Sequence, residues 1–450
     1  MKLCIVGAGS SRLPLMMASV ARSGFSFDEV TLFDIRPDRI QALMPVGLEL
    51  CAFLGASVPF RIASGASDAI EGCQAMILTI RPGFERQRAL DERACLDLGV
   101  IGQETTGPAG LAFATRTIPA VTGYCELAER LAPGYLPVIF TNPAGMVTQA
   151  LIDQGHDRAV GICDSATGAA RKAAGWAGIP FHDVVFEVGG LNHLSWTRKV
   201  TAGGRDILSA ALADREFLER TVPWHAEETA VTGAVPVEYL FYYLRADQAL
   251  AAMAAEPLTR GEAVLRSNSE LLESLPGMGS REKTIHYARY LFSRNDTYMS
   301  YALGHRHGTP GPSTMAEALQ YLETEIGGYA EVAMELLASS ASTNGRLMAL
   351  NVRNGGSIPE LDDDDVVETD CTVGSAGIIP GRHARMPAAD ATLTVRVKEY
   401  ERLAVQSVTA AMRGENARAV ELAIDALTAH PLVPGRQVAA NLVGKLGLFR

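Results

Sequence analysis

A pair of glycines near the start of the chain constrains its fold more than any other feature. Gly7 and Gly9 stand between residues 2–6, an apolar run fit for a buried strand, and the apolar helical pattern of residues 13–20. Gly7 permits a tight turn, and Gly9 lets the backbone come close to a phosphate group at the N-terminus of the following helix. A strand, a glycine turn and a helix in this order predict the first unit of a doubly wound α/β fold.

A carboxylate one strand further along indicates which phosphate compound this turn would hold. Asp34 ends the second predicted strand, where an aspartate accepts hydrogen bonds from ribose hydroxyls and repels a 2′-phosphate, so NAD is favoured over NADP. The residues expected to bind NAD are Gly7, Gly9, Ser10 and Asp34. Arg12 occupies the place of the third glycine of the usual motif, and the alternative is a similar fold that binds another ligand or none.

Strands and helices continue to alternate up to about residue 165. Further strands are expected at 75–80, 137–140 and 157–162, with a helix at 117–131. This alternation predicts a parallel sheet with helices on both faces. We therefore assign residues 1–165 to an N-terminal Rossmann domain, a fold that lactate and malate dehydrogenases also have.

The second half of the chain has a different pattern. Two strands are expected at 184–188 and 194–200, around a glycine-containing turn, and most of the remainder is helical. We therefore assign residues 166–450 to a second domain, of the α+β class, that completes the catalytic site and forms the oligomer. The long helical patterns lie at 209–221, 236–255, 259–275, 313–341 and 398–430.

Charge and hydropathy exclude two classes of partner. The 450 residues carry a net charge of −11, whereas nucleic acids bind basic surfaces. The sequence contains no unbroken run of about 18 apolar residues, so no membrane span is predicted. Residues 1–6 lead straight into the glycine turn, so no signal peptide is expected. The seven cysteines are single and scattered, which is typical of a reduced, cytoplasmic protein.

Two side chains that follow predicted strands can bind a metal ion. Cys163 follows residues 157–162, and His193 lies in the turn after residues 184–188. A thiolate and an imidazole together suit a divalent transition metal, and two protein ligands leave coordination positions open for substrate oxygens. Taken singly, Cys163 is also compatible with a buried apolar residue, and His193 with a hydrogen-bonded structural residue.

Five blocks of sequence resemble one enzyme family over essentially the whole chain. They are GQETTGPAG (102–110), FTNPAGMVTQA (140–150), GICD (161–164), GGLNHLSW (189–196) and PVEYLFYY (236–243). In this order and spacing they closely resemble glycoside hydrolase family 4, which contains NAD- and metal-dependent 6-phospho-glycosidases. The first and fourth blocks are most similar to the 6-phospho-β-glucosidase branch.

The resemblance implies a redox route to hydrolysis. NAD⁺ takes a hydride from C3 of the sugar, the resulting ketone acidifies the C2–H, and Tyr239 removes the C2 proton as the base. The metal, typically Mn²⁺ or else another divalent transition metal, is held by Cys163 and His193 and stabilises the charge on the C2 and C3 oxygens. The aglycone then leaves by elimination, water adds, and C3 is reduced again, so that NAD is not consumed.

Further polar residues are expected to contact the substrate. The resemblance implies that Asn142 and Asn192 contact the sugar. Arg81 is expected near the sugar or its anionic group, and Glu104 has either a supporting role beside the site or a structural role in its loop. Arg294 is a further candidate for an anion contact.

Two positions depart from the family pattern and leave the substrate open. Arg12 begins an Arg-Leu-Pro run where phospho-glycosidases usually have a Tyr-Thr-Pro-like run near the sugar phosphate, so it would contact a phosphate or another anion, such as a uronate. Asp164 stands where the β-type branch has asparagine and the α-type branch has an aspartate thought to be the general acid. The leading expectation is hydrolysis of 6-phospho-β-glucosides; unphosphorylated glycosides, α-linked glycosides and uronides are the alternatives.

Two other functions are compatible with the first domain. An NAD-dependent hydroxyacid dehydrogenase shares the fold but needs an Arg and His-Asp set and no metal, so Cys163, His193 and Tyr239 argue against it. A non-catalytic sensor is disfavoured because every expected catalytic position is occupied. We expect a homodimer or homotetramer, because symmetric homo-oligomers are the usual state of such enzymes.

Overall fold

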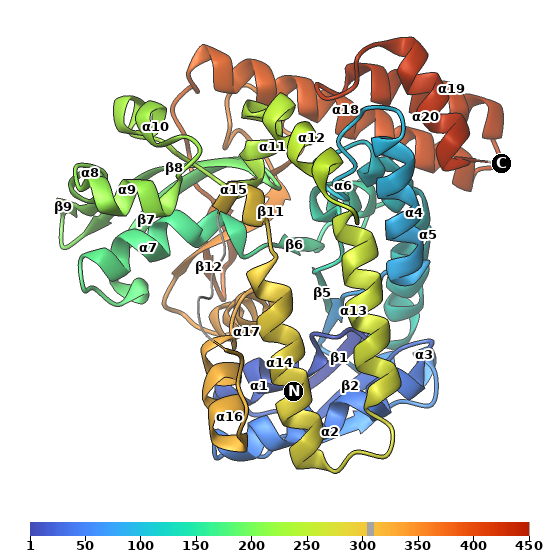
Figure 1. Cartoon of the computed structure of the whole chain (residues 1–450), viewed down its shortest axis with the longest axis vertical. Coiled ribbons are helices and arrows are strands. Elements are labelled where there is room, and N and C mark those ends of the chain that lie inside the picture. Colours follow the sequence, from blue (N-terminus) through green and yellow to red (C-terminus); the bar gives the residue numbers. More distant parts are fainter. Residues whose placement is uncertain (304–309, 450) are drawn as a thin grey trace.

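A single sheet runs through both halves of the chain (Figure 1). The structure is a computed structural model that describes residues 1–303 and 310–449. His305 and His307, which the sequence pattern predicts to face solvent in a loop, lie outside the described residues. Within the described ranges, no helix is both long and apolar enough to cross a membrane.

The first six strands form the parallel, doubly wound sheet that the alternation predicts. They are β1 (Lys2–Val6), β2 (Glu29–Phe33), β3 (Phe60–Ile62), β4 (Ala75–Leu78), β5 (Leu136–Ile139) and β6 (Val160–Ile162). Their order in the sheet is β6-β5-β4-β1-β2-β3, and all neighbours are parallel. In such sheets ligands bind beyond the carboxyl ends of the strands, where the strand order reverses.

Helices cover both faces of this part of the sheet. They are α1 (Leu13–Arg22), α2 (Pro37–Phe53), α3 (Ala66–Ile70), α4 (Phe84–Leu96), α5 (Ala109–Leu131) and α6 (Ala144–Asp153). Cys4 and Val6 pack with α3, α5 and α6, whereas Leu3 and Ile5 pack with α1 and α2. Because both faces are buried, the four residues of β1 that follow Lys2 are all apolar. The predicted helix 117–131 is the second part of α5.

The sheet continues past the predicted domain division. Its further strands are β7 (Val185–Leu191), β8 (Leu194–Ala202), β9 (Arg205–Asp206), β10 (Val235–Pro236), β11 (Arg346–Arg353), β12 (Val366–Gly374) and β13 (Gly377–Pro380). β11 pairs antiparallel with β6, and the order then runs β12-β7-β8-β10. The sequence analysis predicts β7 and β8 but not β11, β12 or β13, and the division at residue 165 stays a prediction.

The helices of the second half are shorter than their apolar patterns suggest. They are α7 (Gly168–Trp176), α8 (Ile207–Leu212), α9 (Arg215–Thr221), α10 (Ala226–Thr232), α11 (Phe241–Leu244), α12 (Ala246–Ala255), α13 (Arg260–Ser274), α14 (Ser280–Asp296), α15 (Ser300–Leu303), α16 (Met315–Thr324), α17 (Tyr329–Ser340), α18 (Ala388–Met412), α19 (Asn416–Ala429) and α20 (Arg436–Leu446). The prediction of one helix at 313–341 is wrong, because Gly328 (φ +62°) separates α16 from α17. Gly414 (φ +80°) likewise interrupts the pattern at 398–430. Both glycines have left-handed backbone conformations that other residues rarely adopt.

Helices of the second half pack against those of the first. α13 contacts α4, α14 contacts α2, and both lie in front of the N-terminal strands in Figure 1. α18 contacts α5 and α6, in the apolar core on the other face of the sheet. The carboxyl ends of the parallel strands are therefore enclosed by residues from both halves of the chain.

Candidate active site

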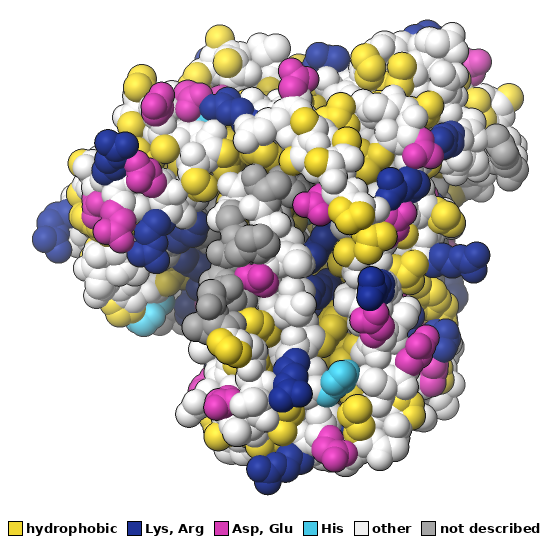
Figure 2. All heavy atoms as spheres, viewed as in Figure 1, with side chains coloured by type: hydrophobic (Ala, Val, Ile, Leu, Met, Phe, Trp, Pro, Cys, Tyr) yellow, Lys and Arg dark blue, Asp and Glu magenta, His cyan; other side chains and the backbone are white. Residues whose placement is uncertain are grey.

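A cavity of about 1270 Å³ opens where the parallel strands end. Its walls come from the glycine turn after β1, from the ends of β4, β5 and β6, and from α13 and α14. Figure 2 shows Lys and Arg side chains set back in a hollow near the centre of this face. Because single small-molecule sites span about 300–1000 Å³, this cavity has room for more than one ligand.

The four residues predicted to bind NAD come together at one end of the cavity. They are Gly7, Gly9, Ser10 and Asp34. Gly7 has a φ of +95°, and a Cβ atom there would lie 2.5 Å from the Thr79 carbonyl oxygen. The Asp34 carboxylate has a role that the sequence does not reveal, because it accepts hydrogen bonds from the backbone N–H groups of Gly9 (2.9 Å) and Arg36 (2.9 Å). Asp34 therefore also braces the glycine turn.

Cys163 and His193 are both almost completely buried. Cys163 directly follows β6, and His193 lies in the two-residue turn between β7 and β8 with a φ of +62°; each is 1% exposed. Burial lowers the pKa of His193 to about 3, so its ring is neutral, which is the form that binds metals. In the described structure neither Nδ1 nor Nε2 of His193 has a hydrogen-bond partner, which is rare for a buried polar side chain.

The donor atoms of this pair fit a divalent transition metal. A thiolate and a neutral imidazole are its usual soft and borderline ligands. Among residues 1–303 and 310–449, no group of three His, Cys, Asp or Glu side chains is arranged to hold a metal. A metal bound by Cys163 and His193 would thus keep positions free for other oxygens.

Tyr239 lies directly against His193. Its ring stacks on the His193 ring, with centroids 3.8 Å apart and planes at 9°. The Tyr298 hydroxyl donates a hydrogen bond to the Tyr239 oxygen at 2.8 Å. Burial raises the pKa of Tyr239 above its usual value, and Glu238 and Cys163 raise it further against the opposing hydrogen bond from Tyr298. The phenol is therefore protonated at neutral pH in this structure.

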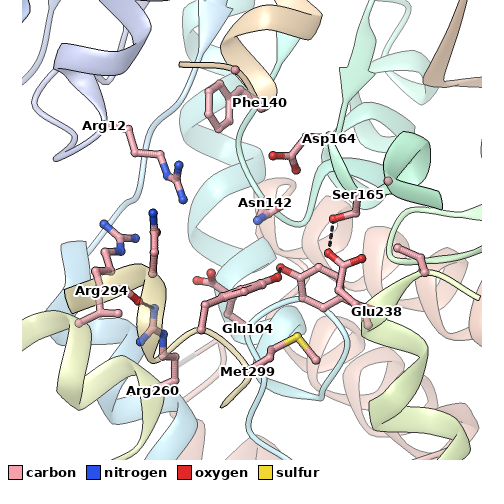
Figure 3. Close-up of a pocket in the computed structure, with 18 of the residues that line it drawn as sticks. Arg12, Glu104, Phe140, Asn142, Asp164, Ser165, Glu238, Arg260, Arg294 and Met299 are labelled. Atoms are coloured by element: carbon pink, nitrogen blue, oxygen red, sulfur yellow. Dashed lines mark hydrogen bonds between the residues drawn. The ribbon is translucent and has the colours of Figure 1, made fainter. Parts of the chain in front are cut away.

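Two carboxyl groups, Asp164 and Glu238, form what we call the acidic wall of the cavity. Asp164 follows the end of β6, Glu238 follows β10, and the Ser165 hydroxyl donates a hydrogen bond to Glu238 at 2.9 Å (Figure 3). Burial raises the pKa of both carboxyl groups, and Arg12 opposes this rise at Asp164. Gly328 packs closely against Asp164, since a Cβ atom there would lie 2.7 Å from its Oδ2.

Three arginines, Arg12, Arg260 and Arg294, form the arginine wall across the cavity from the acidic wall (Figure 3). Arg294 Nη1 donates hydrogen bonds to the hydroxyls of Ser11 (2.9 Å) and Tyr290 (2.7 Å). Burial lowers the pKa of Arg260 to about 10, and the nearby Arg294 contributes to the shift. Arg260 still carries its charge at neutral pH, so this wall is cationic.

Arg81 and Glu104, both predicted near the substrate, line the cavity but pair with each other. Both terminal nitrogens of Arg81 donate to the Glu104 carboxylate, and Arg88 forms an ion pair with it at 3.0 Å. Burial opposes ionisation of Glu104, but the two arginines outweigh this effect and lower its pKa to about 2. Glu104 thus compensates the charge of Arg81 and Arg88.

Asn142 and Asn192, both predicted at the sugar, lie at different depths. Asn142 lines the cavity after β5. Asn192 is 9% exposed and donates its side-chain amide to Glu368 at 3.1 Å. In the described structure the side-chain oxygen of each asparagine is buried without a hydrogen-bond partner, so both can accept a bond from a ligand.

Comparison with known proteins identifies the family. A model described as "Family 4 glycosyl hydrolase" matches residues 2–177, and one described as "Family 4 glycosyl hydrolase C-terminal domain" matches residues 188–433. The chain belongs to family 4 of the glycosyl hydrolases. This confirms the resemblance of the five sequence blocks and sets aside the hydroxyacid dehydrogenase.

Relatives in family 4 align over most of the chain. The 6-phospho-beta-glucosidase BglT of Thermotoga maritima is 26% identical over 99% of this chain and 97% of its own length. The maltose-6'-phosphate glucosidase of Bacillus subtilis is 25% identical over 90% of this chain and 87% of its own length. A structure of the T. maritima 6-phospho-beta glucosidase with NAD and glucose-6-phosphate has a TM-score of 0.78 at 25% identity, covering 99% of this chain and 97% of that chain.

The family-4 site contains residues that the sequence analysis missed. Glu238 directly precedes Tyr239, so its place beside a predicted catalytic residue is the sequence feature that could have indicated it. Arg260 begins α13 and reaches the cavity only because α13 packs against α4. Glu368 lies in β12, a strand that the sequence analysis left unassigned.

Proposed function

We propose that this family-4 enzyme hydrolyses 6-phospho-glucosides, with NAD and a divalent metal as cofactors. The observation that carries the proposal is one cavity with a cationic wall on one side and an acidic wall on the other. A phosphate group suits the arginine wall, because guanidinium groups bind phosphate oxygens through strong charge-assisted hydrogen bonds. The same group is repelled by the acidic wall, so the sugar would be held in one orientation, with its glycosidic bond toward Asp164.

The names of the relatives support a phosphorylated substrate. The two aligned relatives are a 6-phospho-beta-glucosidase and a maltose-6'-phosphate glucosidase. The T. maritima enzyme was solved with NAD and glucose-6-phosphate together. A cavity that holds both a nucleotide end and a cationic wall is consistent with the same pair of ligands here.

NAD is assigned to the glycine turn. The backbone at Gly7, Gly9 and Ser10 would bind the pyrophosphate, and Asp34 would accept hydrogen bonds from the adenosine ribose. Each carboxylate oxygen has more than one lone pair, so Asp34 can do this while bracing the turn. When bound, NAD⁺ supplies an acceptor for the hydride at sugar C3. The hydride is returned to C3 at the end of the cycle.

The metal is assigned to Cys163 and His193, and Mn²⁺ is the ion expected. When bound, it supplies a Lewis acid for the oxygens at sugar C2 and C3. The unpartnered amide oxygens of Asn142 and Asn192 would orient the sugar hydroxyls. The buried, neutral His193 and the nearby thiol are the observation that supports this assignment.

Two residues are assigned to proton transfer. Tyr239 would accept the proton from C2 as a phenolate, because it lines the cavity and lies against His193. Its raised pKa would have to fall for this, and the positive charge of a metal held by His193 would lower it. Asp164 would give a proton to the departing oxygen, because it lies on the cavity wall opposite the arginines. The remaining order is loss of the aglycone from C1, addition of water and reduction of C3, which gives net hydrolysis.

The β-linked 6-phospho-glucoside is the leading substrate. The blocks at 102–110 and 189–196 favour it, whereas Asp164 and the maltose-6'-phosphate glucosidase relative favour an α-linked one. A uronide would also present an anion to the arginine wall and is the next alternative. A neutral glycoside would form no charge-assisted hydrogen bond with the arginine wall, so it is the least favoured.

Hydrolysis of matched p-nitrophenyl sugars tests the proposal. The set contains the 6-phospho-β-glucoside, the 6-phospho-α-glucoside, the unphosphorylated β-glucoside and the β-glucuronide, each with NAD⁺, Mn²⁺ and a reductant. We expect rapid release from the 6-phospho-β-glucoside that stops when either cofactor is withdrawn. Equal rates on the unphosphorylated sugar would refute the phosphate requirement, and rates independent of NAD⁺ would refute the redox route.

A further inference from the structure

A lateral row of paired residues crosses the seam between the two halves of the sheet. β6 meets β11 at Gly161 and Asn351, β11 meets β12 at Asn351 and Glu368, and β12 meets β7 at Glu368 and Gly190. In the next pair of strands, Gly190 of β7 lies opposite Ser195 of β8. Five strands are thus aligned at the level of one glutamate.

Both assigned metal ligands extend from this row. Cys163 lies two positions beyond Gly161, just after β6 ends, and His193 lies three positions beyond Gly190, in the turn that follows β7. The spacing along the row therefore controls the distance between the thiol and the imidazole. A metal site needs that distance to be fixed, because coordination bonds tolerate little error in length.

Glu368 is the hub of the row. It is 1% exposed, and its carboxylate accepts hydrogen bonds from Asn192 Nδ2 (3.1 Å), Asn351 Nδ2 (3.3 Å) and Ser195 Oγ (2.9 Å). All three donors are neutral, so these contacts are hydrogen bonds that orient the side chains and not ion pairs. Burial of a carboxylate is costly even with such donors, which indicates that this one is kept for a purpose other than stability.

Each side of the row is connected to Glu368 by one asparagine. Asn192 directly precedes His193, so the bond to its amide anchors the turn that carries the imidazole. Asn351 packs over Gly161, where a Cβ atom would lie 2.7 Å from the Asn351 Cβ. One carboxylate thus restrains the chain segments of both ligands.

We infer that Glu368 is a positioning residue that sets the distance between the two metal ligands by holding one asparagine beside each of them. The inference rests on the proposed metal-dependent function. Glu368 itself touches neither substrate nor metal. Because the amide nitrogen of Asn192 is bound to Glu368, the amide oxygen is directed away from it, and that oxygen is the buried atom without a partner.

Asp370 provides a matched control for a merely structural role. It is a second buried side chain of β12, two positions further along the strand. Its carboxylate accepts a hydrogen bond from the Val188 N–H (3.0 Å) and lies 3.2 Å from His383 Nε2. Asp370 therefore braces the same neighbouring strand, β7, but at the level of Val188 rather than at the turn.

The test compares Glu368→Met with Asp370→Leu in the full chain. Mn²⁺ affinity is measured by the electron paramagnetic resonance signal of free Mn²⁺, and kcat and KM are measured on whichever glycoside the wild type cleaves. We expect E368M to weaken Mn²⁺ binding by about 10–100-fold and to lower kcat by a similar factor with little change in KM, as for partners that orient metal ligands. D370L removes the contacts with Val188 and His383, so it should lose thermal stability but keep Mn²⁺ affinity and kcat.

Two conservative variants sharpen the comparison. Glu368→Gln keeps an oxygen that can accept from both asparagines, so it should recover most of the Mn²⁺ affinity. Glu368→Asp shortens the side chain by one methylene group. Its carboxylate therefore cannot hold both asparagines at their present separation. It should lose Mn²⁺ affinity while remaining folded, and it replaces E368M if that variant does not fold.

Unchanged Mn²⁺ affinity in E368M, or equal losses in E368M and D370L, would overturn the inference. A wild-type enzyme that binds no Mn²⁺ would overturn the proposed metal site and the role of Glu368 with it. A wild-type enzyme that binds Mn²⁺ but cleaves no 6-phospho-glucoside would overturn the substrate proposal alone, since Mn²⁺ affinity of the variants still decides the role of Glu368.

Discussion

Glu104 and Glu368 are buried glutamates on two sides of the same site, and their surroundings act on them in opposite ways. Burial opposes the charge of both. At Glu104 the guanidinium groups of Arg81 and Arg88 outweigh that effect and lower the pKa to about 2, whereas at Glu368 burial outweighs three neutral donors and raises the pKa to about 7. Neutral hydrogen bonds thus do not offset the desolvation of a carboxylate, but two cations do.

The contrast divides the site into a side with fixed charge and a side whose charge depends on pH. Around Glu104 the ionic contacts persist at any pH well above 2. Around Glu368 the charge changes near neutrality, while the same donors remain in place. The first side suits the recognition of an anion, and the second suits the positioning of neutral groups.

The largest expected effect comes from Glu104→Gln. Removing this carboxylate takes the counter-charge from the half-buried Arg81 and one of two counter-charges from Arg88, which keeps its ion pair with Glu92. The free energy of unfolding should therefore fall by about 3–4 kcal/mol. Urea unfolding at pH 7 measures the change. The double variant with Arg81→Met is the control, because it removes the arginine that loses its counter-charge and should recover part of the loss. A loss below about 1 kcal/mol would show that the arginines do not depend on Glu104.

The pH dependence of stability should differ in sign for the two glutamates. Glu368 keeps its proton in the folded state up to about pH 7 but loses it near 4.5 when unfolded. Its contribution is therefore greatest below pH 4.5 and declines by about 3 kcal/mol as the pH rises through 7. Glu104 contributes most above pH 4.5, and its contribution is lost as the pH falls toward 2.

Unfolding curves of the wild type and Glu368→Gln between pH 4.5 and 8 measure the decline in stability that is expected from Glu368. The glutamine variant does not titrate, so it should lack the decline and become the more stable protein at pH 8. Parallel stability curves for the two proteins would contradict the raised pKa of Glu368.

Arg294→Met should separate anion recognition from catalysis. Loss of a charge-assisted hydrogen bond worth about 1.5–3 kcal/mol should lower kcat/KM for a phosphorylated glucoside by about 10–100-fold. Turnover of a neutral glycoside, where measurable, should not fall. The control is Arg266→Met, because Arg266 lies on α13 and is exposed, paired with Glu270. Equal losses on both substrates would place Arg294 outside the anion contact.

The smallest expected effect comes from Tyr290→Phe on the arginine side. The Tyr290 hydroxyl donates to Asn268 and contacts Ser11 in the glycine turn. It also accepts a hydrogen bond from Arg294, which keeps its bond to Ser11 when the hydroxyl is removed. Removal of the hydroxyl should cost about 1 kcal/mol of unfolding free energy. Thermal unfolding at pH 7 measures it. A loss as large as that of E104Q would show that the hydrogen bonds of an uncharged hydroxyl contribute as much as the ion pairs of Glu104.

The first half of the fold could be predicted because its strands are buried on both faces. β4 and all of β1 after Lys2 are unbroken apolar runs, and a glycine turn or a polar residue marks where each ends. β12 could not be predicted in the same way, because it carries Glu368 and Asp370 in its interior. Those side chains are buried only because partners from β7, β8 and β11 bind them, and one segment of sequence does not contain that information.

The residues of the site also differ in whether the sequence alone could predict them. The residues after predicted strands, Cys163 and Asp164, could be found because the carboxyl ends of parallel strands meet at one edge. Arg260 could not, because its position depends on how α13 packs on α4. Asn192 was predicted at the sugar, but that its amide nitrogen is held by Glu368 could not be foreseen without the strand register.

The pairing of β6 with β11 also bears on synthesis of the chain. β6 ends at Ile162 and β11 begins at Arg346, so the strand that covers the edge of β6 emerges from the ribosome 184 residues later. At about 5–20 residues per second, this interval lasts roughly 10–40 s. During it the nascent first half exposes the backbone N–H and C=O groups of an uncovered edge strand, which is a template for pairing with other chains. Chaperone binding to the nascent chain would therefore be most needed between these two points of translation.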